Sequence, residues 1–254
     1  MTAVETVTAV RRHRPAWHAA TVEDVQAETP RARRIVLQVP TWPGSTAGQH
    51  LDLRLTADDG YQATRSYSVA STGDGTRVEL AVDRVEDGEV SPFLVDALEV
   101  GDALEVHGPL GAWFVWEPTA DGGPTQLIAG GSGVVPMVAM VRAHAAAQHP
   151  SPMRLLYAAR TPEDVFFRRE LDESVSHDAG LEVEYVFSRR SPAGSTRAPG
   201  RLTRLVLEEV ALPAEVGPTV FVCGSTPFVE QVIRWLLDLG HPSDKIRAER
   251  FGGS

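Results

Sequence analysis

The hydrophobic pattern of this chain changes near residues 117–124, and this change constrains the fold more than any other feature. Before it, apolar and polar residues alternate over short segments separated by glycine-containing turn signals. Alternation with a period of two predicts half-buried strands, and only residues 91–98 have a helical pattern. The strands are expected at 34–39, 51–55, 67–70, 78–85 and 103–106. Short strands at this spacing predict an antiparallel barrel or sandwich.

After the change, apolar strand-like runs alternate with helical stretches. The strands are expected at 126–129, 153–159, 181–187 and 220–223, and the helices at 134–148, 165–175, 202–210 and 228–239. This alternation predicts a parallel sheet of the doubly wound type. We therefore expect an N-terminal arm at 1–14, a barrel domain at 15–120 and an α/β domain at 121–254.

Composition limits the classes of protein and of partner. Of the 254 residues, 43% are hydrophobic and 23% are charged, which is typical of a globular protein. The longest apolar stretch, 134–147, is interrupted by Pro136 and Arg142 and is too short to span a bilayer. Residues 1–15 contain no apolar segment of a secretion signal, so we expect a cytoplasmic protein without a membrane partner. The net charge of −10 argues against a nucleic-acid partner.

The chain contains one cysteine, Cys223. One thiol excludes an intramolecular disulfide and an iron–sulfur cluster held by four thiolates of this chain. Any such cluster that exchanges electrons with this chain must belong to another protein. The eight histidines show no metal-ligand spacing, so no metal site is expected.

Arginines gather at 11–14 and 31–34. Such a run is typical of a solvated face or a flexible arm. The alternative is a docking patch for an acidic electron-carrier protein.

The segment Arg65-Ser66-Tyr67-Ser68 suits a flavin nucleotide. In a strand Arg65 and Tyr67 project from the same face. The planar guanidinium of Arg65 can bind phosphate oxygens, and the ring of Tyr67 can stack on isoalloxazine. Ser68 points the other way or offers its backbone and hydroxyl to the edge of the flavin ring. An ordinary amphipathic strand is the alternative interpretation.

Two further segments suit phosphates. Gly88-Glu89-Val90-Ser91 opens the predicted helix, where a helix N-terminus with a hydroxyl can bind a pyrophosphate, although a turn with an N-cap serine has the same pattern. Gly130-Gly131-Ser132-Gly133 lies between an apolar strand and a helix, the context in which glycine turns bind a dinucleotide phosphate. It lacks the Gly-x-Gly-x-x-Gly spacing, so glycine used only for packing is the alternative.

Together and in this order, these segments resemble the ferredoxin–NADP reductase superfamily. That family has Arg-x-Tyr-Ser, then a Gly-x-x-Ser/Thr step, then a Gly-Gly-x-Gly-x-x-Pro turn, which here includes Pro136. The resemblance covers residues 15–251 and implies a six-stranded antiparallel FAD-binding barrel followed by a doubly wound NAD(P)-binding domain, with the active site between them. The Gly88–Ser91 step implies a second phosphate, and therefore FAD rather than FMN.

The resemblance also assigns residues to the cofactors. At the FAD it places Arg65, Ser66, Tyr67, Ser68, Val82, Asp83, Arg84, Gly88, Glu89, Val90, Ser91 and Phe251. At the nicotinamide nucleotide it places Gly130, Gly131, Ser132, Gly133, Pro136, Arg160, Ser188, Arg189, Cys223, Gly224 and Phe228. Around the hydride path it places Tyr67, Ser68, Cys223, Glu249 and Phe251, which position the reactants and are not needed as strong acids or bases. Core roles are the alternatives for Cys223 and Phe251.

The choice of nicotinamide nucleotide depends on Ser188 and Arg189, which follow the third strand of the second half. A serine and an arginine suit a 2′-phosphate, so NADPH is expected over NADH. An exposed basic turn without a ligand is the alternative.

The function implied is that of a stand-alone FAD-dependent reductase, which passes electrons from NAD(P)H through the flavin to a separate one-electron acceptor such as a ferredoxin or an oxygenase component. Two alternatives stay open. One is a reductase of a small acceptor, free flavin or a ferric chelate. The other is a flavin-binding electron-transfer subunit of a larger complex.

Overall fold

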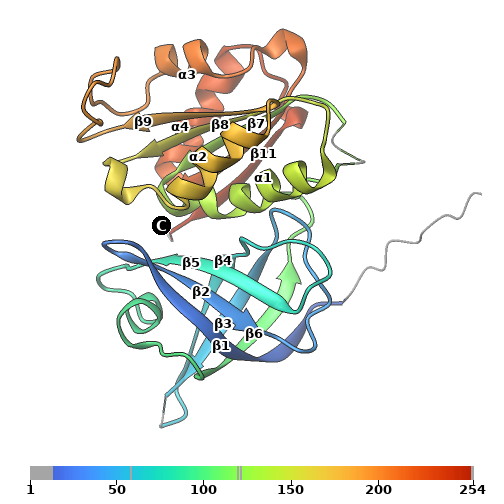
Figure 1. Ribbon diagram of the computed structural model, residues 1–254, viewed down its shortest axis with the longest axis vertical. Helices are drawn as coiled ribbons and strands as arrows, with labels where there is room; N and C mark the ends of the chain where they lie inside the picture. Colours follow the sequence, from blue (N-terminus) through green and yellow to red (C-terminus); the bar gives the residue numbers. More distant parts are fainter. Residues whose placement is uncertain (1–13, 58, 119, 121, 253–254) are drawn as a thin grey trace, which may run out of the picture.

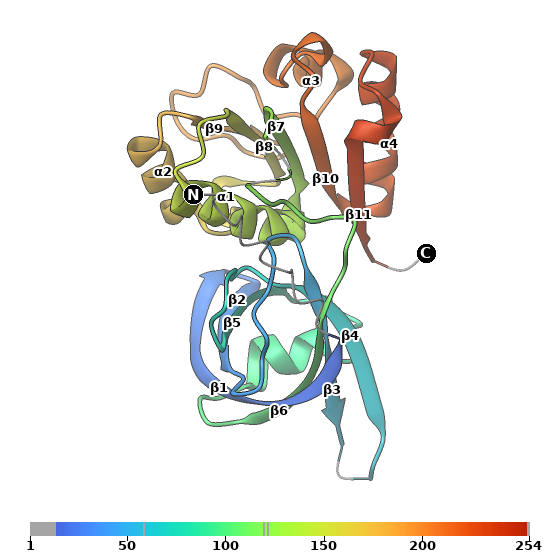
Figure 2. The ribbon, with the colours of Figure 1, turned by 90° about the vertical axis from the view of Figure 1, so that its right-hand side faces the viewer.

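A computed structural model of the chain describes residues 14–57, 59–118, 120 and 122–252 (Figure 1). Except for Arg14, the expected N-terminal arm lies outside the described residues. The first half forms one six-stranded antiparallel sheet that curls into a barrel, seen nearly end-on in Figure 2. Its strands are β1 (Ala16–Thr29), β2 (Ala32–Gln38), β3 (His50–Thr56), β4 (Gln62–Ser68), β5 (Arg77–Asp83) and β6 (Ala103–Leu110). Their order is β4-β3-β6-β1-β2-β5, so β4 and β5 are the two edges.

Alternation builds the barrel core. Ile35 and Leu37 of β2 are fully buried, and so are Leu51 and Leu53 of β3, while the residues between them are less buried. The short helix Phe93–Ala97 adds Leu94 and Val95 to the same core. Inward apolar side chains on every second residue therefore hold the barrel, as the sequence predicts.

The second half forms a five-stranded parallel sheet of order β11-β10-β7-β8-β9. Its strands are β7 (Thr125–Gly130), β8 (Met153–Ala159), β9 (Leu181–Phe187), β10 (Thr219–Ser225) and β11 (Ile246–Phe251). Its α-helices are α1 (Val135–Ala147), α2 (Arg168–His177), α3 (Arg204–Val210) and α4 (Thr226–Asp238). Helices α1 and α2 cover one face, and α3 and α4 the other (Figure 2). The predicted fold, an antiparallel barrel followed by a doubly wound parallel sheet, is confirmed.

Helix α1 lies between the parallel sheet and the barrel (Figures 1 and 2). Every residue from Val135 to Val141 is buried, because the helix packs on the sheet on one side and near the barrel on the other. Met137 and Met140 belong to an apolar cluster that also includes Ala47 and Ala70 of the first half. One apolar cluster therefore includes residues of both halves.

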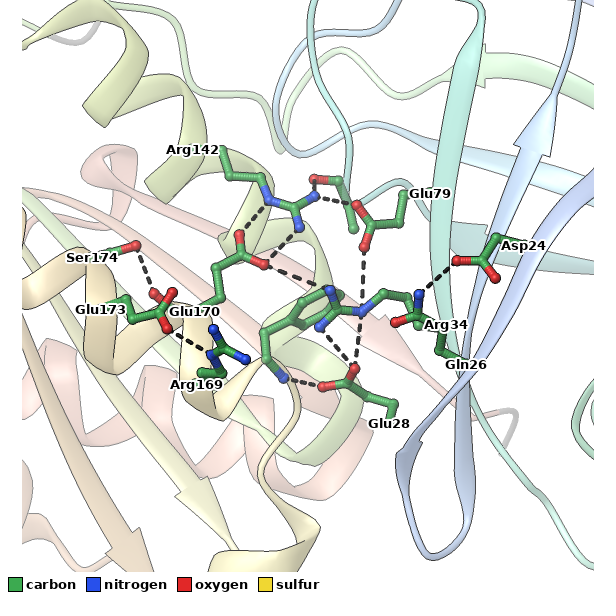
Figure 3. A network of polar contacts seen from close by, with 12 residues as sticks. Asp24, Gln26, Glu28, Arg34, Glu79, Arg142, Arg169, Glu170, Glu173 and Ser174 are labelled. Carbon is green, nitrogen blue, oxygen red and sulfur yellow. Dashed lines mark hydrogen bonds and ion pairs between the residues drawn. The ribbon is translucent and has the colours of Figure 1, made fainter.

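Arg142 of α1 forms the centre of a polar network across the same interface (Figure 3). Its Nε and Nη2 donate to the two carboxylate oxygens of Glu170 in α2, at 2.6 and 2.8 Å. Its Nη1 donates to Glu79 Oε2 of β5 at 2.6 Å and to the carbonyl of Ala70 at 3.0 Å. One guanidinium thus binds two carboxylates that lie on different domains.

Arg34 of β2 completes the network from the barrel side (Figure 3). It donates to Glu28 at 2.9 Å and lies 3.4 Å from Glu79 and 3.8 Å from Glu170. Its guanidinium carbon is 4.3 Å from the ring centroid of Phe167, whose backbone N–H donates to Glu28. Arg34 is therefore part of an internal interface, in contrast to the solvated face or docking patch considered for residues 31–34.

None of the helices in the described residues is both long and apolar enough to cross a membrane. In the same part of the chain, no group of three or more histidine, cysteine, aspartate or glutamate residues is placed to hold a metal ion.

Candidate active site between the two domains

A cavity of about 930 Å³ opens at the carboxyl ends of the parallel strands, where ligands of open α/β sheets bind. Three of its lining residues, Thr29, Arg31 and Asp83, come from the barrel. The second half contributes, among others, Gly130, Gly131, Ser132, Arg160, Ser188, Arg189, Arg201, Phe228, Gln231, Trp235 and Phe251. The cavity is therefore a cleft with walls from both domains.

The glycine turn forms one wall of this cleft. Gly131 has a φ of +57°, a left-handed conformation that glycine adopts without strain. A Cβ on Gly130 would meet the ring of Phe228 at 2.9 Å, and one on Gly133 would meet the carbonyl oxygen of Cys223 at 2.4 Å. The turn thus packs directly against the end of β10, while Gly131 and Ser132 face the cleft. Such an exposed backbone turn before a helix suits a pyrophosphate.

The other predicted nucleotide residues divide into two groups. Arg160, Ser188, Arg189 and Phe228 line the cleft. Pro136 is buried in the first turn of α1, and Cys223 and Gly224 are buried at the end of β10. The structure also places Arg31, Arg201 and Trp235 on the cleft wall, and no motif in the sequence indicated these three residues.

On β4 the arginine and tyrosine lie as the strand pattern predicts. Arg65 pairs with Leu53, and Tyr67 with Leu51, both of which point into the barrel. Burial raises the pKa of Tyr67 to about 12, so its phenol stays protonated at neutral pH. An uncharged, half-buried aromatic ring on an edge strand is suited to stacking on a flat ligand.

The Gly88–Ser91 step lies beside Arg65, because the Glu89 carboxylate forms an ion pair with the Arg65 guanidinium. Ser91 is buried, and its Oγ accepts a hydrogen bond from the backbone N–H of Val85 at 3.0 Å. The serine thus closes the 85–91 turn, and its hydroxyl hydrogen is still available to donate.

The three residues predicted at the end of β5 to contact the FAD have different surroundings. Val82 is buried in the barrel core, and Arg84 donates to Asp96 at 2.7 Å. Asp83 lines the cleft near Arg31 and Arg160. Burial raises the pKa of Asp83, and the two arginines oppose this rise.

Strand β11 carries Glu249, which links the two domains at Arg65–Ser68, the segment predicted to bind flavin and called the flavin segment below. Ser68 Oγ of β4 donates to Glu249 Oε1 at 3.3 Å, across 181 positions of sequence. Burial raises the pKa of Glu249 to about 7, and the Ser68 hydrogen bond partly offsets this rise. Cys223 pairs with Glu249 in the sheet, and burial raises the pKa of its thiol well above the ordinary value. The thiol is therefore neutral, which argues against a nucleophilic role.

An unpaired nitrogen lies near this contact. His50 of β3 pairs with Ser68 in the barrel sheet, and its Nδ1 is buried without a hydrogen-bond partner in the described part of the chain. Burial lowers the pKa of His50, which keeps the ring neutral. The unpartnered His50 Nδ1, the half-buried ring of Tyr67 and the guanidinium of Arg65 are polar and aromatic groups that fit a flavin nucleotide.

We predict that Glu249→Gln changes how stability depends on pH. The native pKa of about 7 exceeds the ordinary 4.5, so the native state favours the protonated carboxyl, and its stabilising contribution is lost as pH rises through 7. Without FAD, the free energy of unfolding of the wild type should fall relative to the variant by about 3 kcal/mol from pH 4.5 to 8. Urea unfolding measured across this range tests the prediction.

Glu184→Gln, at an exposed carboxylate of β9, is the matched control and should follow the wild-type profile. A constant difference between wild type and Glu249→Gln across the range would contradict the prediction.

Comparison with known proteins agrees with this geometry. A family model described as an oxidoreductase FAD-binding domain matches residues 20–115, and one described as an oxidoreductase NAD-binding domain matches residues 127–234. Ferredoxin–NADP reductase B of Sorangium cellulosum is 34% identical over 81% of this chain and 84% of that protein. The reductase subunit of glycine betaine monooxygenase from Chromohalobacter salexigens is 31% identical over 82% of this chain.

This chain spans 56% of that reductase subunit, and about half the length of several other curated relatives. Among solved structures, a cytochrome P450 reductase from Amycolatopsis superposes with a TM-score of 0.82 at 30% identity. That alignment covers 94% of this chain and 71% of the reductase. The likeness therefore extends over both domains.

Proposed function

This chain belongs to the ferredoxin–NADP reductase superfamily, whose members bind FAD and NAD(P)H, and we propose that it carries electrons from NADPH to a separate ferredoxin or oxygenase component. A bound FAD would supply an acceptor for the two electrons of a hydride that can then give them up one at a time. The protein supplies the binding, orientation and electrostatics.

The observation that most supports this proposal is the contact between Ser68 and Glu249. It brings the flavin segment of β4 to the ends of β10 and β11, beside the cleft that the glycine turn lines. A ring that stacks on Tyr67 and a nucleotide held at Gly131 would then lie at the same domain boundary. Adjacent reactants are the main requirement of hydride transfer, since orientation alone contributes several kcal/mol.

In this proposal the side chains position the two cofactors and exclude water from the space between them. Tyr67 would stack on the flavin ring as a neutral phenol, and the uncharged Cys223 thiol is buried at the end of β10 behind the cleft-lining residues. Glu249 holds a proton at its carboxylate near Ser68 Oγ at pH values below about 7. Phe251 lines the cleft, and its ring would cover the face of a bound flavin that the nicotinamide must reach.

NADPH is the proposed electron donor because Ser188, Arg189 and Arg201 all line the cleft between the two domains. Ser188 follows β9, and its backbone N–H donates to the carbonyl of Ala159 at 2.9 Å, which fixes this turn at the edge of the cleft. Two guanidinium groups suit a doubly charged 2′-phosphate.

The acceptor is proposed to be a separate protein. Two of the relatives are named as a ferredoxin–NADP reductase and as the reductase subunit of an oxygenase. The single cysteine means that these 254 residues cannot themselves hold an acceptor cluster with four thiolates. We propose residues 15–120 and 121–254 as the FAD-binding and NADP-binding domains.

The test is the anaerobic half-reaction of the FAD-loaded protein with NADPH and, separately, with NADH. NADPH should bleach the oxidised-flavin absorbance faster than NADH, and Arg189→Glu should remove this preference by repelling the 2′-phosphate. Absence of bleaching with either nucleotide would overturn the proposed reductase. Equal rates in the wild type would overturn only the choice of NADPH.

A further inference from the structure

The barrel sheet has two edges, β4 and β5, and one side chain connects them at the flavin segment. Glu89 lies in the segment after β5, and its carboxylate contacts two residues on the β4 side. Its Oε2 forms an ion pair with Arg65 Nη2, and its Oε1 accepts a hydrogen bond from the Tyr61 hydroxyl at 2.8 Å. Both carboxylate oxygens therefore have partners, and the side chain is held across the open edge.

The donors of Arg65 are divided between two acceptors. Nη1 donates to the carbonyl of Thr64 at 2.8 Å, and Nη2 is paired with Glu89. A pyrophosphate that accepts hydrogen bonds from both Nη groups of Arg65 takes the Nη2 donor that Glu89 holds in this structure. The phosphate and the Glu89 carboxylate are alternative ligands of one guanidinium.

Charge and exposure determine whether the Glu89 carboxylate or the pyrophosphate binds the Arg65 guanidinium more strongly. The side chains of Arg65 and Glu89 are 51% and 48% exposed, so water screens their ion pair, and a pyrophosphate can replace the carboxylate. After replacement, the negative carboxylate and the negative pyrophosphate lie on the same edge of the barrel and repel each other. Tyr61 increases this opposition, because its hydroxyl holds Glu89 near the site.

We propose that Glu89 competes with the FAD pyrophosphate for Arg65 and thereby weakens FAD binding by this chain, with Tyr61 keeping the carboxylate in the competing position. The inference rests on the proposed function for the presence of FAD at this site. The Gly88–Ser91 turn is expected to bind the pyrophosphate, whereas the Glu89 side chain within that turn would oppose this binding. Glu89 is thus a determinant of how firmly the flavin is retained.

The experiment measures the dissociation constant of FAD for the full-length, FAD-depleted chain by quenching of flavin fluorescence. Glu89→Gln keeps the size of the side chain and removes its charge, so the dissociation constant should fall about tenfold, equivalent to about 1.4 kcal/mol. Tyr61→Phe should lower it by a smaller factor. Glu86→Gln is the matched control, since it removes the same charge from an exposed position of the same turn, and it should leave the constant within twofold.

A double variant separates competition from simple repulsion. If Glu89 acts by occupying Arg65, the gain from Glu89→Gln should disappear in an Arg65→Gln background. An unchanged or raised dissociation constant for Glu89→Gln, or a tenfold gain that persists without Arg65, would overturn the inference. Failure of the wild type to bind FAD at all would instead overturn the proposed function, so the two failures are distinguishable.

Discussion

Arg142→Met is expected to lower the free energy of unfolding by about 3–5 kcal/mol, because it removes one partner from a largely buried ion-pair network. The Arg142 side chain is 25% exposed, and its guanidinium binds Glu170, Glu79 and the carbonyl of Ala70. Methionine fills much of the same volume but leaves both carboxylates at the domain interface with only the longer contacts of Arg34. Urea unfolding followed by tryptophan fluorescence measures the loss.

Arg169→Met is the matched control for this variant. Arg169 lies on α2, one residue before Glu170, and forms an ion pair with Glu173 one helical turn away. Because its side chain is 90% exposed, its removal should cost less than about 1 kcal/mol. Equal losses for the two variants would show that the network contributes no more than a surface ion pair.

Gly133→Ala should have the second largest effect, a loss of about 3 kcal/mol in the free energy of unfolding, at the upper end of what overpacking costs. The added Cβ would lie 2.4 Å from the carbonyl oxygen of Cys223 and 2.7 Å from the backbone nitrogen of Gly224. These are backbone atoms, so no side-chain rotation relieves the contact. The glycine turn and the end of β10 must move apart, which should also weaken NADPH binding. Thermal unfolding with and without NADPH measures both effects.

Gly123→Ala is the control, because a Cβ there meets no atom within 4 Å and the residue is exposed. Its stability should stay within about 0.5 kcal/mol of the wild type. A Gly133→Ala protein as stable as this control would contradict the tight packing of the turn against β10.

The sequence predicted the two-part fold because most strands and helices have strong periodicity, and it was weakest at strands with few inward apolar residues. Strand β1 was not predicted, since only Ala20 and Val22 of its fourteen residues are buried. Strand β4 was placed too late, at 67–70, because it is an edge strand with only Ala63 and Ser68 buried. These strands depend on pairing with distant segments, and local pattern does not contain that information.

The motifs predicted parts of the site better than their surroundings. The glycine turn, Arg160, Ser188 and Arg189 were expected at the nucleotide, and the structure brings them to one cleft. Strand β11 was not predicted as an element, because charged residues at 247, 249 and 250 obscure its alternation. Arg201 and Trp235 reach the cleft through the packing of a loop and of α4, which leaves no motif in the sequence. The Arg34 and Arg142 network was missed for the same reason, since its charged members come from five elements, β1, β2, β5, α1 and α2.

Because Ser68 and Glu249 lie far apart in sequence, their contact forms late during translation. All six barrel strands are synthesised before residue 111, so the nascent barrel can fold while the second domain is still being translated. The carboxyl group that faces Ser68 is made 181 residues later. A barrel that binds flavin during translation therefore does so before Glu249 lies beside Ser68. The site is complete only after β11 has left the ribosome and paired with β10.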